Sequence, residues 1–267
     1  MGSSQRLVNL IPVSHPDRIT LKHLQYKYPT RSALTLECEL RQIEKAVQRG
    51  FKRLDMMPVS GETLSIVGYG PSLVDTWELV THPCITTSGA HDFMLERGFV
   101  PDYHAQCDGR DHQVEFLSKP HKDVSYLMAT VCHPSIWDRL EGHKVFLWHN
   151  CHGEHVVEWI GKNDPNGLLV AGGSNIGLSA IHLGGIMGFR KFKLFGMDCN
   201  FRDFKRHAGK HPDPVQQAVI KRWTGRKWFT SPQMSNAVDE FLMLAKNESL
   251  EFEVFGDSLL KDCFELL

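Results

Sequence analysis

Short apolar runs alternate with helical stretches from residue 63 to the end of the chain, and no other feature constrains the fold as strongly. The predicted strands cover residues 63–67, 84–87, 103–107, 124–129, 144–148, 168–171, 192–195 and 252–255. Strands that alternate with helices form a mostly parallel sheet with both faces covered. Because such crossovers are right-handed, we predict an α/β fold with a Rossmann-like, doubly wound sheet.

The first 60 residues have a different pattern. Leu36, Leu40, Ile43 and Val47 recur at helical spacing, which predicts an amphipathic helix packed on the main domain. A chain of 267 residues is long enough for one α/β domain and an appendage. We therefore expect a helical or irregular appendage over 1–60 and a Rossmann-like domain over 61–267.

Composition and charge exclude several classes of protein. The formal net charge is −1, so general binding to nucleic acids or to a membrane is not expected. No apolar run approaches the roughly 20 residues that cross a bilayer, and residues 1–12 lack a signal-peptide core. The seven cysteines are spaced singly without a C-x-x-C pair, which argues against a disulfide framework. These features predict a cytoplasmic protein.

Ligands of doubly wound folds bind at the carboxyl ends of the strands. There, Gly68, Gly70, Pro71 and Ser72 form a turn between a strand and a helix, and Ser88 follows the next strand. Glycine lets a backbone approach a ligand closely, and the amides of a helix N-terminus attract phosphate. This turn predicts nucleotide binding, although a plain tight turn would have the same residues.

The segment Gly172, Gly173, Ser174 and Asn175 repeats this pattern before another helix. Its small residues predict contact with a second part of the nucleotide. Close packing of a strand on a helix also requires glycine, so that interpretation stays open.

Three carboxylates follow strands. Asp108 and Asp111 come after the run at 103–107, and Asp198 comes after the run at 192–195. Carboxylates beside a phosphate site commonly hold Mg²⁺, so Mg²⁺ is the predicted cofactor. The alternative is that Asp108 or Asp198 caps a turn or pairs with Arg110 or Arg202.

A loop rich in basic residues follows Asp198. It contains Lys205, Arg206, His207 and His211. Such a loop can cover phosphates and offset the charge of a transition state, whereas an ordinary solvated loop has the same composition.

A second group of histidines, His149, His152 and His155, recurs at intervals of three residues. This spacing is not that of an H-E-x-x-H zinc helix. We expect surface histidines there, and metal binding by them stays open.

Several linked motifs resemble one known family. Residues 64–73 contain G-x-G-P-S-L, residues 98–108 contain G-F-V-P-D-Y followed by Asp108, and 172–174 with 187–198 contain G-G-S and G-F-x-x-F-x-L-F-G-x-D. His207 with Ala208 also matches. Over about residues 60–260 the chain resembles the 6-hydroxymethylpterin diphosphokinase, MptE-like family. That family is related to the central domain of flagellin-modifying motility accessory factors and, more distantly, to bacterial sialyltransferases.

The resemblance implies nucleotide-dependent group transfer in a Rossmann-like fold, with the turn at 68–72 at the nucleotide. Three features disfavour sialyl transfer. Residues 227–232 lack the histidine of the sialyltransferases, Cys199-Asn200-Phe201 replaces their tyrosine, and Asp108 is a carboxylate that they tend to lack.

We therefore expect Mg²⁺-dependent diphosphate transfer from ATP to a small hydroxyl acceptor. Asp108, Asp198 and His207 are the predicted catalytic residues, Lys205 and Arg206 neutralise phosphate, and Asp108, Asp111 and Asp198 are the candidate metal ligands. One alternative is a glycosyltransferase that uses a CMP- or other nucleotide-activated sugar, and another is a catalytically silent nucleotide-binding module. The sequence is compatible with an oligomer.

Overall fold

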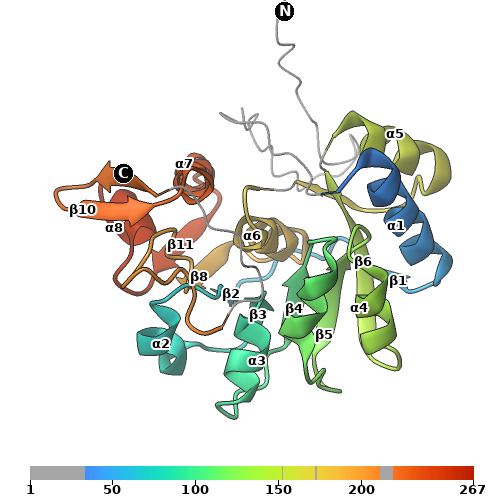
Figure 1. Ribbon diagram of the computed structural model, residues 1–267, viewed down its shortest axis with the longest axis horizontal. Helices are drawn as coiled ribbons and strands as arrows, with labels where there is room; N and C mark the ends of the chain where they lie inside the picture. Colours follow the sequence, from blue (N-terminus) through green and yellow to red (C-terminus); the bar gives the residue numbers. More distant parts are fainter. Residues whose placement is uncertain (1–33, 152, 172, 211–218) are drawn as a thin grey trace, which may run out of the picture.

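The computed structural model describes residues 34–151, 153–171, 173–210 and 219–267. There the chain forms a nine-stranded sheet, a separate two-stranded hairpin and a set of covering helices (Figure 1). The strands are β1 (Lys52–Arg53), β2 (Thr63–Val67), β3 (Cys84–Thr87), β4 (Tyr103–Gln106), β5 (Ser125–Ala129), β6 (Lys144–Cys151), β7 (Leu169–Ala171), β8 (Lys191–Phe195), β9 (Ile220–Trp223), β10 (Lys227–Thr230) and β11 (Glu251–Val254). The α-helices are α1 (Leu36–Gln48), α2 (Leu73–Thr76), α3 (Ala90–Leu95), α4 (Pro134–Arg139), α5 (Glu154–Asn163), α6 (Ile176–Ile186), α7 (Pro232–Ala245) and α8 (Leu259–Glu265). Two 3₁₀ helices cover Trp77–Leu79 and Asp111–Leu117.

The main sheet is parallel throughout. Its strand order is β1-β6-β5-β4-β3-β2-β8-β11, and β7 also pairs with β6. Neighbouring strands run in the same direction in each pair. Strands β3 to β6 follow one another on one side of β2, whereas β8 and β11 lie on the other side. The predicted Rossmann-like, doubly wound sheet is therefore confirmed.

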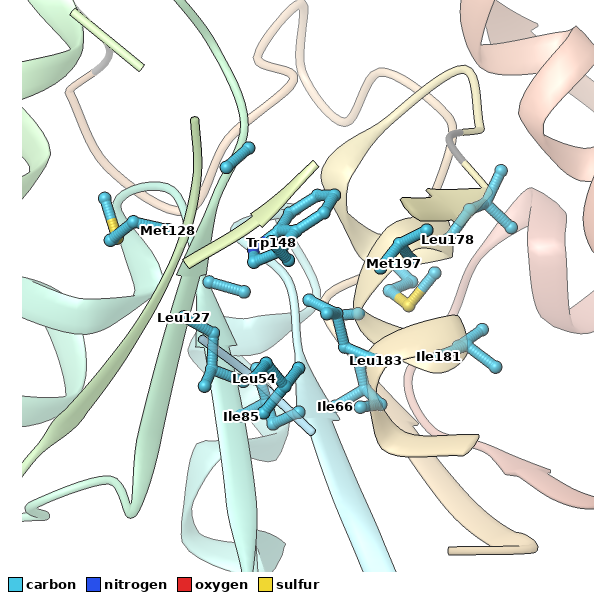
Figure 2. Close-up of a cluster of buried hydrophobic side chains, with 14 of the residues drawn as sticks. Leu54, Ile66, Ile85, Leu127, Met128, Trp148, Leu178, Ile181, Leu183 and Met197 are labelled. Atoms are coloured by element: carbon cyan, nitrogen blue, oxygen red, sulfur yellow. The ribbon is translucent and has the colours of Figure 1, made fainter. Parts of the chain in front are cut away.

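Helices cover both faces of the sheet. Figure 1 shows α2, α3 and α4 along one face and α6 and α7 along the other. The helix α6 packs against β2, β3, β4 and β7. Figure 2 shows its side chain Leu183 beside the buried strand residue Ile66, and Leu178 beside Met197. None of the described helices combines the length and the apolar character needed to cross a membrane.

The predicted N-terminal helix is present as α1, and Ile43 and Ala46 on its apolar side are buried. Thr35 caps it by accepting a hydrogen bond from the amide of Cys38. The helix packs on α4. The short strand β1, which follows α1, pairs with β6, so residues before position 61 contribute a strand to the main sheet. The domain boundary between residues 60 and 61 stays a prediction.

The hairpin formed by β9 and β10 and the C-terminal helix α8 were not expected from the sequence. Polar contacts hold them together. Asp262 of α8 accepts hydrogen bonds from Trp228 Nε1 at 2.8 Å and from Arg226 Nε at 2.9 Å. Because these partners are far apart in the sequence, periodicity could not reveal the pairing.

Close packing of α6 on the sheet leads to a prediction at Gly184. A Cβ atom there would lie 2.6 Å from Leu64 Cδ2 and 2.8 Å from Phe192 Cε1. Gly184→Ala should therefore lower the free energy of unfolding by about 1–3 kcal/mol, as overpacked cores do. Gly161 in α5 is the matched control, because it is exposed and a Cβ atom there meets nothing within 4 Å.

Gly161→Ala should be neutral or stabilising by up to about 1 kcal/mol, since alanine favours a helix. Urea denaturation of both variants measures the difference. Equal effects of the two substitutions would contradict the packing of α6 described above.

Candidate functional site

The direction of the strand order reverses at β2, whose neighbours are β3 and β8. In open α/β sheets, ligands bind beside the carboxyl ends of strands at such a reversal. The turn after β2 contains Gly68 and Gly70, and the turn after β8 contains Gly196 and Asp198. The sequence-predicted segments 68–72 and 196–198 therefore lie side by side.

The two turns are in direct backbone contact. The amide of Gly68 donates to the carbonyl of Phe195, and the amide of Gly70 donates to that of Gly196, each at 2.7 Å. A Cβ atom at either Gly68 or Gly70 would lie 2.5 Å from the Gly196 oxygen. Close packing of the two turns thus requires both glycines, whether or not a ligand is bound.

Asp198 fixes this arrangement. Its side chain is only 2% exposed, and it accepts hydrogen bonds from the Ser72 amide at 2.6 Å and from the Ser72 hydroxyl. Burial raises the pKa of Asp198 to about 6, although the Ser72 hydrogen bonds favour the charged form. The carboxylate occupies the position at the start of α2 where the sequence predicts a phosphate. The amides of Gly68, Gly70 and Ser72 therefore all donate within the protein.

The segment 173–175 is held in a similar way. Glu240 of α7 accepts a hydrogen bond from the Ser174 amide at 2.7 Å, and Asn236 bonds to the Ser174 hydroxyl. Burial raises the pKa of Glu240 above its usual range. Asn175 caps α6 by accepting from the Leu178 amide at 3.0 Å. Gly172 lies outside the described residues. Sequence reasoning missed Glu240 and Asn236, because α7 showed only its apolar stripe.

Asp108 lies on the turn after β4, and Asp111 begins the 3₁₀ helix that follows it. Arg110 Nη2 lies 2.6 Å from Asp108 Oδ2, and Gln113 Nε2 donates to the same oxygen at 3.0 Å. The ion pair that the sequence offered as an alternative for Asp108 is therefore formed. The side chain of Asp111 is 84% exposed.

The carboxylates of Asp108 and Asp198 are not brought together. They follow β4 and β8, which are separated by β3 and β2. At about 4.8 Å for each strand spacing, the two turns are about 14 Å apart. One Mg²⁺ ion needs oxygen ligands at about 2.1 Å, so it cannot bind both carboxylates in this arrangement.

The basic loop lies over the first turn through Tyr69. The Ala208 amide donates to the Tyr69 carbonyl at 2.9 Å, and the His207 ring stacks on the Tyr69 ring with centroids 5.7 Å apart. Arg202 forms an ion pair with Asp75. The structure thus brings His207 to the turn at 68–72, whereas Lys205 and Arg206 precede it on the loop and His211 lies outside the described residues.

Ser88 directly precedes Gly89, which the Tyr69 ring approaches closely. Its backbone has a φ of 49°, in the left-handed region, and the ring of Tyr69 fills the space beside the next residue, Gly89. A side chain at position 89 would collide with that ring. Ser88, Tyr69 and the basic loop therefore form one continuous part of the carboxyl edge.

His149 is not the surface residue that the sequence led us to expect, whereas the side chain of His155 is 36% exposed. His149 is buried and lies 2.8 Å from Thr130 Oγ1 and 2.9 Å from Asp164 Oδ2. Burial lowers the pKa of His149, while Asp164 partly offsets that effect. His155 lies 3.1 Å from the buried carboxylate of Glu39. His152 lies outside the described residues.

Comparisons with known proteins agree with this architecture. A family model described as 6-hydroxymethylpterin diphosphokinase MptE-like matches residues 37–204. Among solved structures, a MAf glycosyltransferase from Magnetospirillum magneticum AMB-1 is similar, with 14% identity and a TM-score of 0.59. The similarity covers 86% of this chain but only 41% of that one, and at this identity it shows the fold alone. The comparison with curated proteins gave no match.

The raised pKa of Asp198 predicts how stability depends on pH. The native state holds the Asp198 proton more tightly than the unfolded state, whose ordinary pKa is 3.8. Its contribution to stability is therefore present at low pH and is lost as the pH rises from about 4 to about 6. The loss is on the order of 3 kcal/mol.

Asp198→Asn should remove this loss, because an asparagine amide can bond to both the amide and the hydroxyl of Ser72. Chemical denaturation between pH 4 and 7.5 measures the difference from wild type. The exposed Glu248 provides the control, since Glu248→Gln should follow the wild-type curve. A wild-type pH dependence in Asp198→Asn would show that Asp198 titrates normally.

Proposed function

Because this chain belongs to the 6-hydroxymethylpterin diphosphokinase MptE-like family of transferases, we propose that it transfers a diphosphate group from ATP to a hydroxyl group of a small acceptor. The observation that carries the proposal is the contact of the basic loop with the turn at 68–72, at the reversal of the strand order. That contact sets cationic side chains beside the edge where ligands of doubly wound folds bind.

Side chains, not backbone amides, contact the phosphates in this proposal. The amides of Gly68, Gly70 and Ser72 donate to acceptors within the protein. Lys205 is exposed on the loop, and Arg206 is half-buried beside it. Charge-assisted hydrogen bonds from these two residues would hold the negative phosphates. Pro71 and the glycines shape the turn, and Ser88, next to the Gly89 that the Tyr69 ring approaches, offers a hydroxyl.

The reaction is a displacement at phosphorus. The acceptor oxygen forms a bond to the β-phosphorus of ATP, and the bond from that phosphorus to the oxygen bridging the α-phosphorus breaks. AMP leaves with the bridging oxygen, and the acceptor keeps the β- and γ-phosphates. His207 takes the hydroxyl proton in this scheme, since a neutral imidazole is a suitable base near pH 7.

Mg²⁺ fits this edge only in part. Asp198 is fully engaged by Ser72, and Asp108 would have to exchange Arg110 for the ion. The exposed Asp111 is accessible at the start of the 3₁₀ helix that follows the turn of Asp108. We propose that Mg²⁺ arrives on ATP and meets Asp111 and Asp108, with most ligands supplied by phosphate and water. The ion would offset charge on the phosphate oxygens.

Sugar transfer from a CMP- or other nucleotide-activated donor is the second candidate. The observation that favours it is the fold shared with the MAf glycosyltransferase. The same basic loop would then contact the diphosphate or monophosphate of the nucleotide, and no metal would be needed. A silent module would bind a nucleotide without turnover.

A ligand panel separates these candidates. The full-length protein is titrated with ATP, GTP, CTP, CMP, CDP and UDP by calorimetry, with and without Mg²⁺, and AMP release is followed with acceptor alcohols. We expect ATP to bind most tightly and only with Mg²⁺. Tighter binding of CMP or CTP without metal would replace the diphosphate proposal with sugar transfer. Binding of ATP with no product from any acceptor would favour the silent module.

The basic loop provides a variant test. The double variant Lys205→Ala/Arg206→Ala should weaken ATP binding about 10- to 100-fold, the equivalent of one or two charge-assisted hydrogen bonds. Lys246→Ala is the matched control, because Lys246 is an exposed lysine at the end of α7, outside the basic loop. Unchanged ATP affinity in the double variant would remove these two residues from the site.

A further inference from the structure

Three potential metal ligands converge at the amino end of the sheet. His82 precedes β3, Cys84 is its first residue, and Asp102 directly precedes β4. A ring nitrogen of His82, the sulfur of Cys84 and a carboxylate oxygen of Asp102 all lie within 4.8 Å of one another. Asp108, Asp111 and Asp198 follow the opposite ends of their strands, so this group lies at the other edge from the candidate functional site.

Hydrogen bonds hold the group in place but leave ligand atoms available. His82 Nδ1 lies 2.6 Å from Asp102 Oδ2, and the Cys84 amide donates to the same oxygen at 2.8 Å. Both of these interactions use Oδ2, so Oδ1 has a position for another partner. The His82 ring stacks on Phe99 with centroids 4.5 Å apart and planes inclined by 6°, which fixes the ring orientation.

We propose that His82, Cys84 and Asp102 bind a zinc-type divalent ion, with water as the fourth ligand. Imidazole nitrogen, thiolate sulfur and carboxylate oxygen are the donors that Zn²⁺ takes, at about 2.0–2.3 Å. Tetrahedral ligands at those distances are about 3.3–3.8 Å apart, so the group needs only a small contraction. The thiol releases its proton when the ion binds.

Accessibility fits this assignment. The side chains of His82 and Asp102 are 55% and 37% exposed, whereas Cys84 is buried. An ion can therefore enter from solvent on the side of His82 and Asp102, where water completes the coordination. A purely structural role, in which Asp102 caps the start of β3, accounts for the hydrogen bonds to Oδ2. It does not require a thiol within reach of the same carboxylate.

The proposed ion is independent of the nucleotide chemistry. Mg²⁺ is a hard ion that takes oxygen ligands, whereas the thiolate of Cys84 selects a softer ion. Such an ion would join the start of β3 to the start of β4. It does not depend on the proposed transferase activity.

Cobalt absorption tests the proposal directly. The full-length protein is treated with a chelator and titrated with Co²⁺, then with Zn²⁺. We expect one equivalent of Co²⁺ to produce a near-ultraviolet charge-transfer band from a thiolate ligand, and Zn²⁺ to displace it. Cys84→Ser should lose the band. Cys151→Ser is the matched control and should keep it, because Cys151 is another free thiol outside the group.

The exposed ligands keep the test informative if Cys84→Ser fails to fold. His82→Ala and Asp102→Asn should each weaken Zn²⁺ binding about tenfold or more in competition with a chromophoric chelator. No Co²⁺ band in the wild-type protein would overturn the proposal. Wild-type Zn²⁺ affinity in both variants would also overturn it, as would loss of the band in Cys151→Ser alone.

Discussion

The carboxylate of Asp198 joins the two turns at the centre of the carboxyl edge. A buried carboxylate is costly unless hydrogen bonds compensate for lost water, and Ser72 supplies two of them. Asp198 reaches Ser72 only because Gly70 has no side chain, since a Cβ atom there would lie 2.7 Å from Asp198 Oδ2. The G-x-G-P-S motif after β2 and the G-x-D motif after β8 therefore pack directly against each other, and the strands β2 and β8 that precede them are paired.

The same arrangement is found at Ser174, whose amide donates a hydrogen bond to the buried carboxylate of Glu240. Both serine turns therefore bind a carboxylate of the protein itself where the sequence predicts contact with a nucleotide. Under the proposed function, the groups that make the edge rigid differ from the groups that would bind the ligand. Backbone amides and buried carboxylates fix the turns, while in the proposed function Lys205, Ser88 and Asp111 would contact the ligand.

The sequence predicted the strands well and the partners of the site poorly. Strands β2 and β3 begin and end where the apolar runs do, because each is buried and is followed by glycine or serine. The two-residue strand β1 is Lys-Arg and carries no apolar signal. The Asp198–Ser72 contact spans 126 residues and the Glu240–Ser174 contact spans 66, so only the assembled sheet determines them. The sequence could identify the segments near the site. It could not determine whether each of their residues contacts a ligand or another residue of the protein.

Tyr69 connects the rigid edge to the basic loop. It lies between Gly68 and Gly70 in the sequence. Its carbonyl accepts a hydrogen bond from the Ala208 amide, and its ring stacks on His207. Farther along the loop, Asp203 and Phe204 both have positive φ, in a turn closed by paired hydrogen bonds between Arg202 and Lys205. Non-glycine residues in that region store strain, which persists only when surrounding contacts hold it. The Arg202–Asp75 ion pair and Tyr69 provide such contacts at the two ends of the loop. The placement of the cationic side chains therefore depends on the aromatic residue that occupies the variable position of the G-x-G-P-S turn.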